Sequence, residues 1–471
     1  MKTCCTAICI VFFIFFTAKN SFADVQRVYT LPELKKIILI RNADNIIASN
    51  RTLLSKNMYQ AAVNKFFWPY IRVAVDSPLA AGADNIVLPA TNYYLFSTNY
   101  ALIGTLTLEE KLPWDMLFKA ETKYQLAIQT NVRNYFSGSL SLSQSIFKRN
   151  DDAYTADAAQ RDLELALRTF VQNERDLVYT IDSQYYDTVT SEITLASSRR
   201  RVTSGYSNTV MTGYKYKAGL INEITYLRLD QSYSKTLADF ESQKLSLRSQ
   251  KSALALLMDT TNYDFNIDLT LPVEKVRYDK QSSIARSISN DLTLQSIALN
   301  IWKEKKSLEN ILDDYRPNGT ASVTLARDFN ANYDLKLSLN LSSALFDRMQ
   351  SDLAIEASVV AISNLNIQIV QRQRTIQSTI ERIIDSLDIM ETNITIYQQS
   401  FVIAKKSFDI NMERFNLGVI STETMVTTED DYYATELSLV QQKVAYLKAI
   451  SQLENKFWMV RAAAPTAGTN K

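Results

Sequence analysis

The sequence repeats itself at a constant distance of 199 positions, and no other feature restricts its fold as strongly. Residues 139–147 (SLSLSQSIF) reappear as residues 338–346 (SLNLSSALF), and residues 216–221 (YKAGLI) reappear as residues 415–420 (FNLGVI). Because both matches share one offset, no gap is needed in the stretch between them. The chain is therefore predicted to contain two copies of one structural plan.

Each predicted copy has the same order of elements. A helix over residues 31–65 or 281–315 is followed by Pro69 or Pro317, which stops a helix and starts an extended segment. Short alternating segments come next. A long helix and a returning helix complete the copy. A single glycine, Gly219 or Gly418, divides them and is predicted to close the first helix with a positive φ and reverse the chain.

The alternating segments predict four strands per chain, arranged as two hairpins. In residues 333–341 leucines alternate with polar residues, so the apolar side chains lie on one face of a strand. Residues 139–142 alternate in the same way. Such a face can cover a soluble core or contact membrane lipid. The residues predicted to face lipid are Leu140, Leu142, Leu335, Leu337, Leu339 and Leu341.

The two predicted long helices differ in composition. Between Ile376 and Phe408 the apolar residues recur in alternating steps of four and three, which is a sustained heptad pattern. The matching stretch of the first copy places polar residues, among them Thr188 and Ser198, in that pattern. A helix in the first copy is therefore predicted from the repeat.

The first hairpin carries an insertion of 49 residues that the second hairpin lacks, located within approximately residues 79–134. It contains the alternating run Leu102–Leu108. The sequence leaves open whether this run is an extra strand, a cap or a soluble lobe.

Composition excludes several functions. The 471 residues include no histidine, which removes the usual base for nucleophilic catalysis and the imidazole metal ligand. A net charge of +1 gives no field that would attract nucleic acid. Neither a cofactor nor a metal site nor an enzymatic activity is expected.

Residues 1–23 resemble a secretory signal peptide, with Lys2, an apolar run over residues 8–16 and small residues before Asp24. The three cysteines all lie in this segment, so disulfides and thiol catalysis are not expected in the mature chain. No later run of 18 consecutive apolar residues predicts a transmembrane helix.

Four strands are too few to close a membrane barrel, because spanning barrels need at least about eight. Two chains would supply eight strands, and three would supply twelve and room for a channel. Together with the predicted secretion, this favours an outer membrane in which helices project into the periplasm.

The duplicated helix–strand–strand–helix–helix order, the LxLxxx(I/L)F motif before each long helix and the (Y/F)xxG(L/V) motif at each tip resemble the TolC-like outer-membrane efflux channels. The resemblance covers nearly all of residues 29–458 except the insertion. It implies a mainly α fold with long antiparallel helical hairpins forming a coiled-coil tunnel. A homotrimer would close a twelve-stranded membrane β-barrel in outer-membrane lipid.

The resemblance also implies a function and partners. The trimer would be a passive exit duct for small molecules or type I secreted polypeptides. A periplasmic adaptor (membrane fusion) protein and an inner-membrane transporter would dock on it, and no nucleic acid is involved. The tips Gly219, Leu220, Gly418 and Val419 would contact the adaptor.

The family closes its entrance with aspartates six and nine residues after the second tip glycine. In this sequence those positions hold Thr424 and Thr427, which puts the usual gate in doubt. Asp431, seven residues after Thr424, could supply a carboxylate ring. The alternative is that Glu423, Glu429, Asp430 and Asp431 form an ordinary solvated acidic face. The basic run 199–201 is predicted to be solvated or paired with carboxylates.

The predicted organisation is a signal peptide (1–23), repeat 1 (24–262), a connection (263–280), repeat 2 (281–458) and a C-terminal tail (459–471). Two rival hypotheses remain. A secreted coiled-coil scaffold or adhesin would have soluble strands and no channel. A periplasmic enzyme using carboxylates has no motif to support it.

Overall fold

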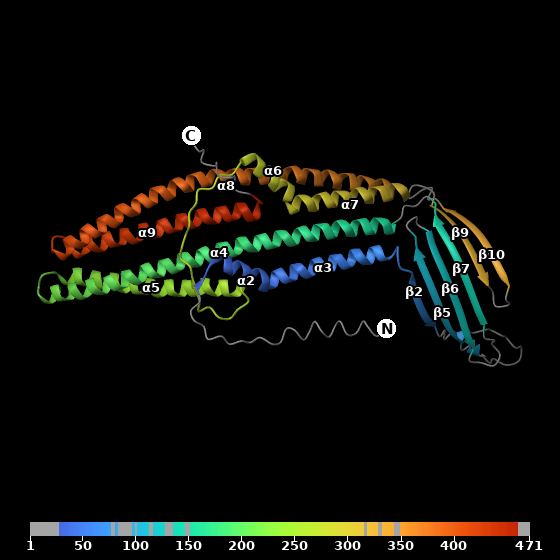
Figure 1. The fold of residues 1–471 in the computed structure, drawn as a ribbon, viewed down its shortest axis with the longest axis horizontal. Helices are drawn as coiled ribbons and strands as arrows, with labels where there is room; N and C mark the ends of the chain where they lie inside the picture. The colour runs from blue at the N-terminus through green and yellow to red at the C-terminus, as the bar shows by residue number, and fades with distance from the viewer. Residues whose placement is uncertain are drawn as a thin grey trace, which may run out of the picture. The chain divides into compact units, whose positions relative to one another are not determined.

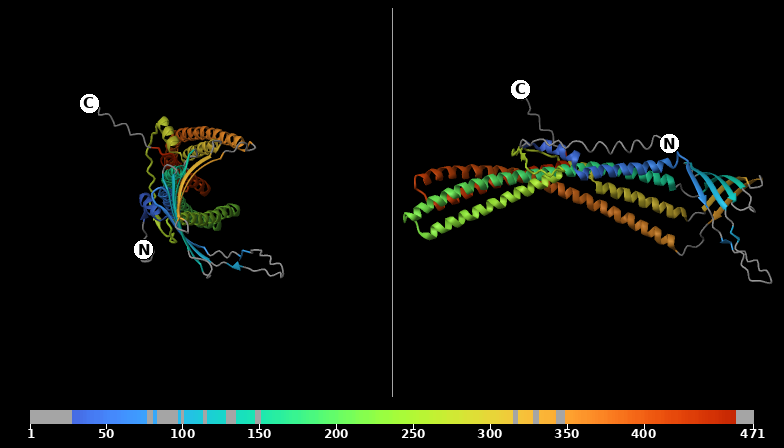
Figure 2. Two further views of the ribbon diagram at one scale, coloured as in Figure 1. Left: turned by 90° about the vertical axis from the view of Figure 1, so that its right-hand side faces the viewer. Right: turned by 90° about the horizontal axis from the view of Figure 1, so that it is seen from below.

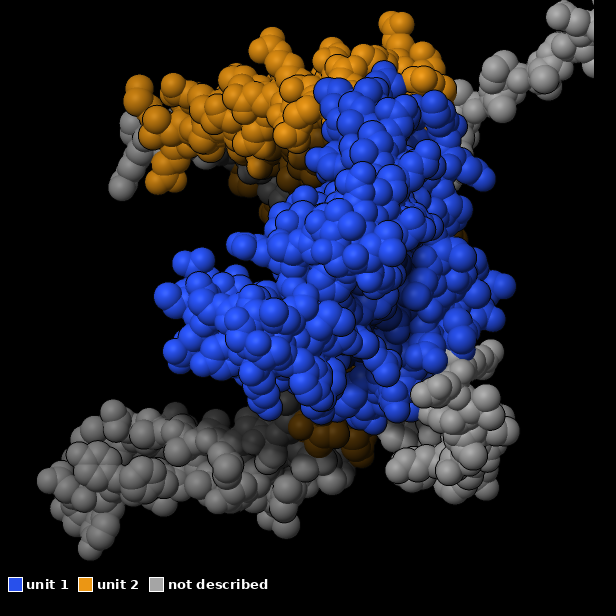
Figure 3. Space-filling view, turned by 90° about the vertical axis from the view of Figure 1, so that its left-hand side faces the viewer, with its two compact units in different colours: residues 1–42, 178–275, 388–450 blue, residues 43–177, 276–387, 451–471 orange. Residues whose placement is uncertain are grey.

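The computed structural model describes residues 28–76, 81–82, 97–98, 101–112, 116–127, 135–146, 151–314, 318–327, 332–342 and 349–459. The predicted signal peptide lies outside these residues, as do Phe147, Pro317 and Phe346 and most of the C-terminal tail. The chain divides into two compact units (Figure 3). Unit 1 comprises residues 1–42, 178–275 and 388–450, and unit 2 comprises residues 43–177, 276–387 and 451–471.

The helices occur in the same order and with nearly the same lengths in both halves of the sequence (Figure 1). The first half contains α2 (Leu31–Arg41), α3 (Ala43–Asn64), α4 (Asp151–Lys217) and α5 (Glu223–Leu257). The second half contains α6 (Lys280–Asn290), α7 (Leu292–Asp314), α8 (Gln350–Asn416), α9 (Thr422–Ser451) and a π-helical turn, η1 (Gln452–Lys456). Helices α4 and α8 have 67 residues each and start 199 positions apart. The starts of α5 and α9 are also 199 positions apart.

The N-terminal helix predicted in each half is divided into two. Asn42 separates α2 from α3, and Asp291 separates α6 from α7, each with an extended backbone conformation. Asp291 accepts a hydrogen bond from the backbone N–H of Leu294 at 2.9 Å, so it starts a new helix as an N-cap. Its carboxylate also pairs with Arg372 of α8 at 2.8 Å. The break therefore positions a side-chain link between two helices.

Unit 2 contains an antiparallel sheet of six strands, not four. The strands are β2 (Tyr70–Asp76), β5 (Ala101–Lys111), β6 (Met116–Ala127), β7 (Tyr135–Ser145), β9 (Asn318–Arg327) and β10 (Tyr333–Ser342). Their order is β10-β9-β7-β6-β5-β2. The four-strand prediction was wrong because the insertion supplies β5 and β6, which lie between the two strands expected to form the first hairpin.

The two faces of the sheet are chemically different. On β7 and β9, Leu140 pairs with Leu325 and Leu142 with Val323, and the intervening residues are serines and threonines. In Figures 1 and 2 the helices of unit 2 end at one border of the sheet, and no described helix covers either face. The apolar face is consequently exposed, which is unusual for a water-soluble sheet.

Four short strands form two pairs outside this sheet. Strand β1 (Val28–Tyr29) pairs in parallel with β8 (Asn266–Ile267) in unit 1. Strands β3 (Ala81–Gly82) and β4 (Ser97–Thr98) form a separate antiparallel pair within the connection from β2 to β5.

The heptad pattern of α8 is confirmed as a packing surface. Ile376, Ile380, Leu387 and Ile394 are buried, and Phe401 and Phe408 stack on Tyr432 of α9. One 18-residue window of α8 has a mean hydropathy of 1.6 and is 6% buried, so by length and composition it could cross a membrane. Core helices of soluble proteins pass the same test, so one such helix does not establish a membrane span.

Candidate functional site at the helical tips of unit 1

The long and returning helices of each half are joined by short turns, here called the tips. Gly219 and Gly418 adopt φ values of 75° and 74°. In each tip the residue after the glycine donates its N–H to a carbonyl five residues earlier, from Leu220 to Lys215 and from Val419 to Arg414, both at 2.9 Å. This is a Schellman cap, in which glycine satisfies the left-handed position. The predicted positive φ values are confirmed.

Apolar side chains project from both tips. Leu220 and Val419, the residues after the glycines, are both exposed, and so is Leu417. Apolar side chains held outward by two similar rigid turns form a surface on which another protein can dock.

The predicted gate residues Glu423, Thr424, Thr427 and Asp431 all lie on the first three turns of α9 and are all exposed. The Thr427 hydroxyl donates to the Glu423 carbonyl at 3.0 Å, and the Thr424 hydroxyl lies 3.0 Å from that of Ser421. Among the described residues, no ion pair to the Asp431 carboxylate occurs. Its negative charge therefore remains available on the surface.

The neighbouring Glu429 does not belong to a solvated acidic face. Its side chain is buried, and Ser204 of α4 donates a hydrogen bond to its carboxylate at 2.7 Å. Burial raises the pKa of Glu429, and the nearby Asp430 raises it further, while the Ser204 hydroxyl lowers it. The same burial raises the pKa of Tyr433 to about 12.

Two arginines join α4 to α9. Arg200 pairs with Glu436 at 2.7 Å, and Arg201 pairs with Asp430. The prediction that the basic run 199–201 pairs with carboxylates is confirmed for these two residues. The solvated acidic face is thus reduced to Glu423 and Asp431, because Asp430 is paired and Glu429 is buried.

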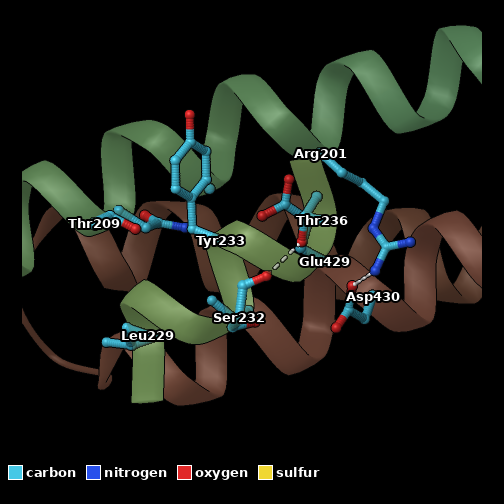
Figure 4. Close-up of a pocket in the computed structure, with 11 residues that line it drawn as sticks. Arg201, Thr209, Leu229, Ser232, Tyr233, Thr236, Glu429 and Asp430 are labelled. Atoms are coloured by element: carbon cyan, nitrogen blue, oxygen red, sulfur yellow. Dashed lines mark hydrogen bonds and ion pairs between the residues drawn. The ribbon is translucent and has the colours of Figure 1, made fainter. Parts of the chain in front are cut away.

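These contacts surround a small cavity of about 40 Å³ between α4, α5 and α9 (Figure 4). Arg201 and Asp430 face each other at one side of the cavity. Tyr233 of α5 lies at the other side, with its ring directed toward α4. A larger groove of about 540 Å³ runs between α4, α8 and α9, with Arg199, Met412 and Tyr433 among its lining residues. Neither space could be predicted from the sequence, since burial of Glu429 depends on which helices surround it.

The second candidate surface is the sheet. All six leucines predicted to face lipid lie on its apolar face and are exposed. The polar side chains of β9 and β10 face the other way, where the hydroxyls of Ser322 and Ser338 lie 2.6 Å apart.

No family model and no curated protein matches the sequence. Solved structures do match. The CmeC outer membrane channel of Campylobacter jejuni aligns with a TM-score of 0.69 at 12% identity, covering 91% of this chain and 85% of that one. VceC of Vibrio cholerae gives 0.68 and 12%, covering 91% and 95%. The open state of the Neisseria gonorrhoeae MtrE channel gives 0.61 and 12%, covering 91% and 88%.

The chain has the TolC-like channel fold. The alignment extends over both halves, so the resemblance found in short motifs holds for the fold. The TolC-like fold of this chain departs from the expected plan in its sheet, where six strands stand in place of four.

Proposed function

We propose that this protein is an outer-membrane exit duct that passively conducts solutes or secreted polypeptides from the periplasm to the exterior. The observation that carries the proposal is the exposed apolar face that continues across the whole sheet. Three strands, β5, β6 and β7, have 11 or 12 residues. A tilted strand of about 9–11 residues spans a bilayer. The similar solved structures are outer-membrane channels by their names.

A ring of three chains fits the surfaces of one chain. Cyclic closure needs two different complementary surfaces on each subunit. The sheet has two free edges, β2 and β10, which run in opposite directions, so β10 of one chain can pair antiparallel with β2 of the next. In unit 1, α8 exposes a further apolar row at heptad spacing that can contact another copy: Ile389, Ile396, Ile403 and Ile410.

The tips serve as the docking surface in this proposal. Gly219, Leu220, Gly418 and Val419 would contact a periplasmic adaptor protein that links the duct to an inner-membrane transporter. The rigid Schellman caps and the exposed Leu220 and Val419 support this role. Tip variants Leu220→Asp and Val419→Asp should keep the channel but lose export.

The gate in this proposal is set deeper than in the family. A threefold ring of Asp431 carboxylates would attract and bind cations, with Thr424 and Thr427 nearer the entrance. Asp431→Asn should weaken block by divalent cations added on the periplasmic side of a planar bilayer. Thr427→Val is the matched control, because it changes the same face without changing the charge. Equal block in wild type and Asp431→Asn would remove Asp431 from the gate.

The duct is tested by purification and reconstitution. Detergent-extracted protein should have the native mass of a trimer and should conduct ions in planar bilayers. A water-soluble monomer with a rod-like hydrodynamic radius would instead support the secreted scaffold or adhesin.

A further inference from the structure

The inserted hairpin β5–β6 lies inside the sheet of unit 2. Strand β5 pairs with β2 from Ile103–Asp76 to Glu109–Tyr70, and β6 pairs with β7 from Gln125–Tyr135 to Met116–Gln144. The hairpin is thus hydrogen-bonded on both sides over most of its length. A cap or a separate soluble lobe would leave β2 and β7 paired with each other, and they are not.

The hairpin also continues both faces of the sheet. Leu106 pairs across to Val73 on β2, and Ala120 pairs across to Leu140 on β7, so the apolar face passes through the hairpin without a change of side. Leu106 and Tyr124 are exposed on that face like Leu140. A lipid-facing barrel wall requires that apolar and polar side chains alternate in the same register on the hairpin and on its neighbouring strands β2 and β7.

The opposite face of the hairpin carries charges where β7 carries serines. Lys119 pairs with Glu121 at 3.1 Å and with Glu109 at 3.4 Å, and Lys123 pairs with Glu121 at 2.6 Å. Ser139 and Ser141 on β7 lie directly beside Glu121 and Lys119. The insertion therefore adds a cluster of two acidic and two basic side chains to the polar face.

An inserted pair of strands preserves the direction of every other strand. Because β5 and β6 are two, β2 and β7 remain antiparallel to each other, and the free edges remain β2 and β10. The chain can therefore close with its copies as a four-stranded subunit would, but over a longer perimeter.

From this geometry, and resting on the exit-duct function proposed above, we infer that three chains close an eighteen-stranded barrel whose lumen is lined by the Glu109–Lys119–Glu121–Lys123 cluster. Barrel diameter grows roughly linearly with strand number, so the pore is about 1.5 times as wide as that of a twelve-stranded barrel. The duct accordingly admits larger hydrophilic cargo through the outer membrane, and that cargo passes a band of mixed charge.

Adjacent residues on β6 provide the test. The three cysteines lie at positions 4, 5 and 9, so a background without other thiols is readily made. In it, Glu121→Cys and Ala120→Cys place a thiol on opposite faces of one strand. A charged, membrane-impermeant methanethiosulfonate should modify Glu121→Cys and reduce single-channel conductance, and it should leave Ala120→Cys unmodified and the conductance unchanged. A lipid-soluble maleimide should reach Ala120→Cys.

The cross-strand neighbours Ser139→Cys and Leu140→Cys on β7 are the matched controls, because β7 belongs to the wall with or without the insertion. Suppose that the charged reagent modifies Ser139→Cys and not Leu140→Cys on β7, while it modifies both β6 variants equally. In that case the hairpin lies outside the barrel wall, and the eighteen-stranded barrel is refuted while the exit-duct function stands. If the β7 pair shows no such pattern either, the exit-duct function fails with it.

The strand count is tested by native mass and by polymer exclusion. The wild-type trimer should admit neutral polyethylene glycols, added from the extracellular side, that a variant lacking residues 77–134 excludes. Conductance of the variant should fall to about half, in proportion to barrel cross-section. A native mass of a dimer would mean a barrel of twelve strands and would overturn the count of eighteen. Equal polymer exclusion limits for wild type and for a deletion variant shown to be a folded trimer would overturn it too. If the deletion variant does not fold, the cysteine-labelling experiment on β6 and β7 still tests the inference.

Discussion

The two returning helices, α5 and α9, start 199 positions apart in the sequence but have different environments in unit 1. The matched positions Leu245 on α5 and Val444 on α9 are 67% and 6% exposed. On α5 the buried apolar residues are confined to its last turns, at Leu254 and Ala255. Helix α9 is buried along its length, at Met425, Tyr433, Leu439, Val444, Tyr446, Ala449 and Ile450.

This difference shows that one sequence plan supports two packing roles. Helix α9 contacts both α4 and α8, through Glu436 to Arg200 and through Tyr432 to Phe408, and so forms the core of unit 1. Helix α5 keeps apolar residues such as Leu227 and Leu245 on its surface. An exposed apolar row on one helix of a pair is what a neighbouring copy of the chain would cover.

The largest expected contrast is between matched positions of the long helices. Leu387 of α8 and Thr188 of α4 are 199 positions apart, and both are buried. Leu387→Ala should lower the free energy of unfolding by about 2–5 kcal/mol, because it leaves a cavity in the apolar seam. Thr188→Val should have a much smaller effect, because the Thr188 hydroxyl bonds to the Gln184 carbonyl one turn back in its own helix. Urea unfolding in detergent would measure both, and equal losses would contradict the contrast.

The pair Leu245 and Val444 sharpens the comparison of α5 with α9. Val444→Ala should cost about 2 kcal/mol of folding stability, since two buried methyl groups are lost. Leu245→Ala should change the stability of a single chain by less than about 0.5 kcal/mol. If α5 contacts another copy, Leu245→Ala should nevertheless increase the fraction of monomer in analytical ultracentrifugation. A stable trimer with Leu245→Asp would show that this part of α5 faces solvent in the assembly.

The polar centre of α9 gives a somewhat smaller effect. The buried Tyr446 hydroxyl lies 2.9 Å from the Glu391 carboxylate on α8 and 2.9 Å from the Glu274 carbonyl. Tyr446→Phe should cost about 1–2 kcal/mol, because the buried acceptors lose a donor. Tyr263→Phe, at a position that is 44% exposed, is the control and should be neutral. An unchanged midpoint of thermal unfolding for Tyr446→Phe would show that water replaces the hydroxyl.

The smallest expected effect concerns Glu429 and its counterpart Asp230 on α5, 199 positions earlier and exposed. Since burial raises the pKa of Glu429, the folded chain binds this proton more tightly than the unfolded chain. Ionised Glu429 therefore opposes folding at neutral pH, and stability should increase as pH falls through the folded pKa toward the unfolded value.

Glu429→Gln should accordingly be more stable than wild type at pH 7 and should lose this part of the pH dependence. Asp230→Asn is the matched control, because the same type of change is made at an exposed position of α5. Unfolding free energies measured between about pH 4 and pH 8 would decide, and a destabilised Glu429→Gln at pH 7 would mean that the hydrogen bond from Ser204 outweighs the cost of burial.

Several structural features could be predicted because they depend on local sequence. The glycines at the tips adopt the expected left-handed conformation because other residues are strained there. The leucines of β10 lie on one face because side chains alternate along any strand. The division of the N-terminal helices was missed, although Asn42 and Asp291 are common helix-capping residues.

For the insertion, the strand could be predicted from the sequence, but its pairing partners could not. The run Leu102–Leu108 alternates as a strand does, and it is part of β5. Alternation indicates a strand, but it does not identify the neighbours with which that strand pairs. The placement of β5 and β6 between β2 and β7 follows from hydrogen bonds between segments that are distant in the sequence.

The sequence alone determined the twofold order of elements, the two tips and the chemical difference between the faces of the strands, because each depends on residues within a few positions of one another. Only the tertiary structure decided that the sheet has six strands, that α9 is buried while α5 is exposed, and that Glu429 is buried and accepts a hydrogen bond from Ser204. Those outcomes depend on which surfaces meet, and burial and pairing are properties of contacts between segments.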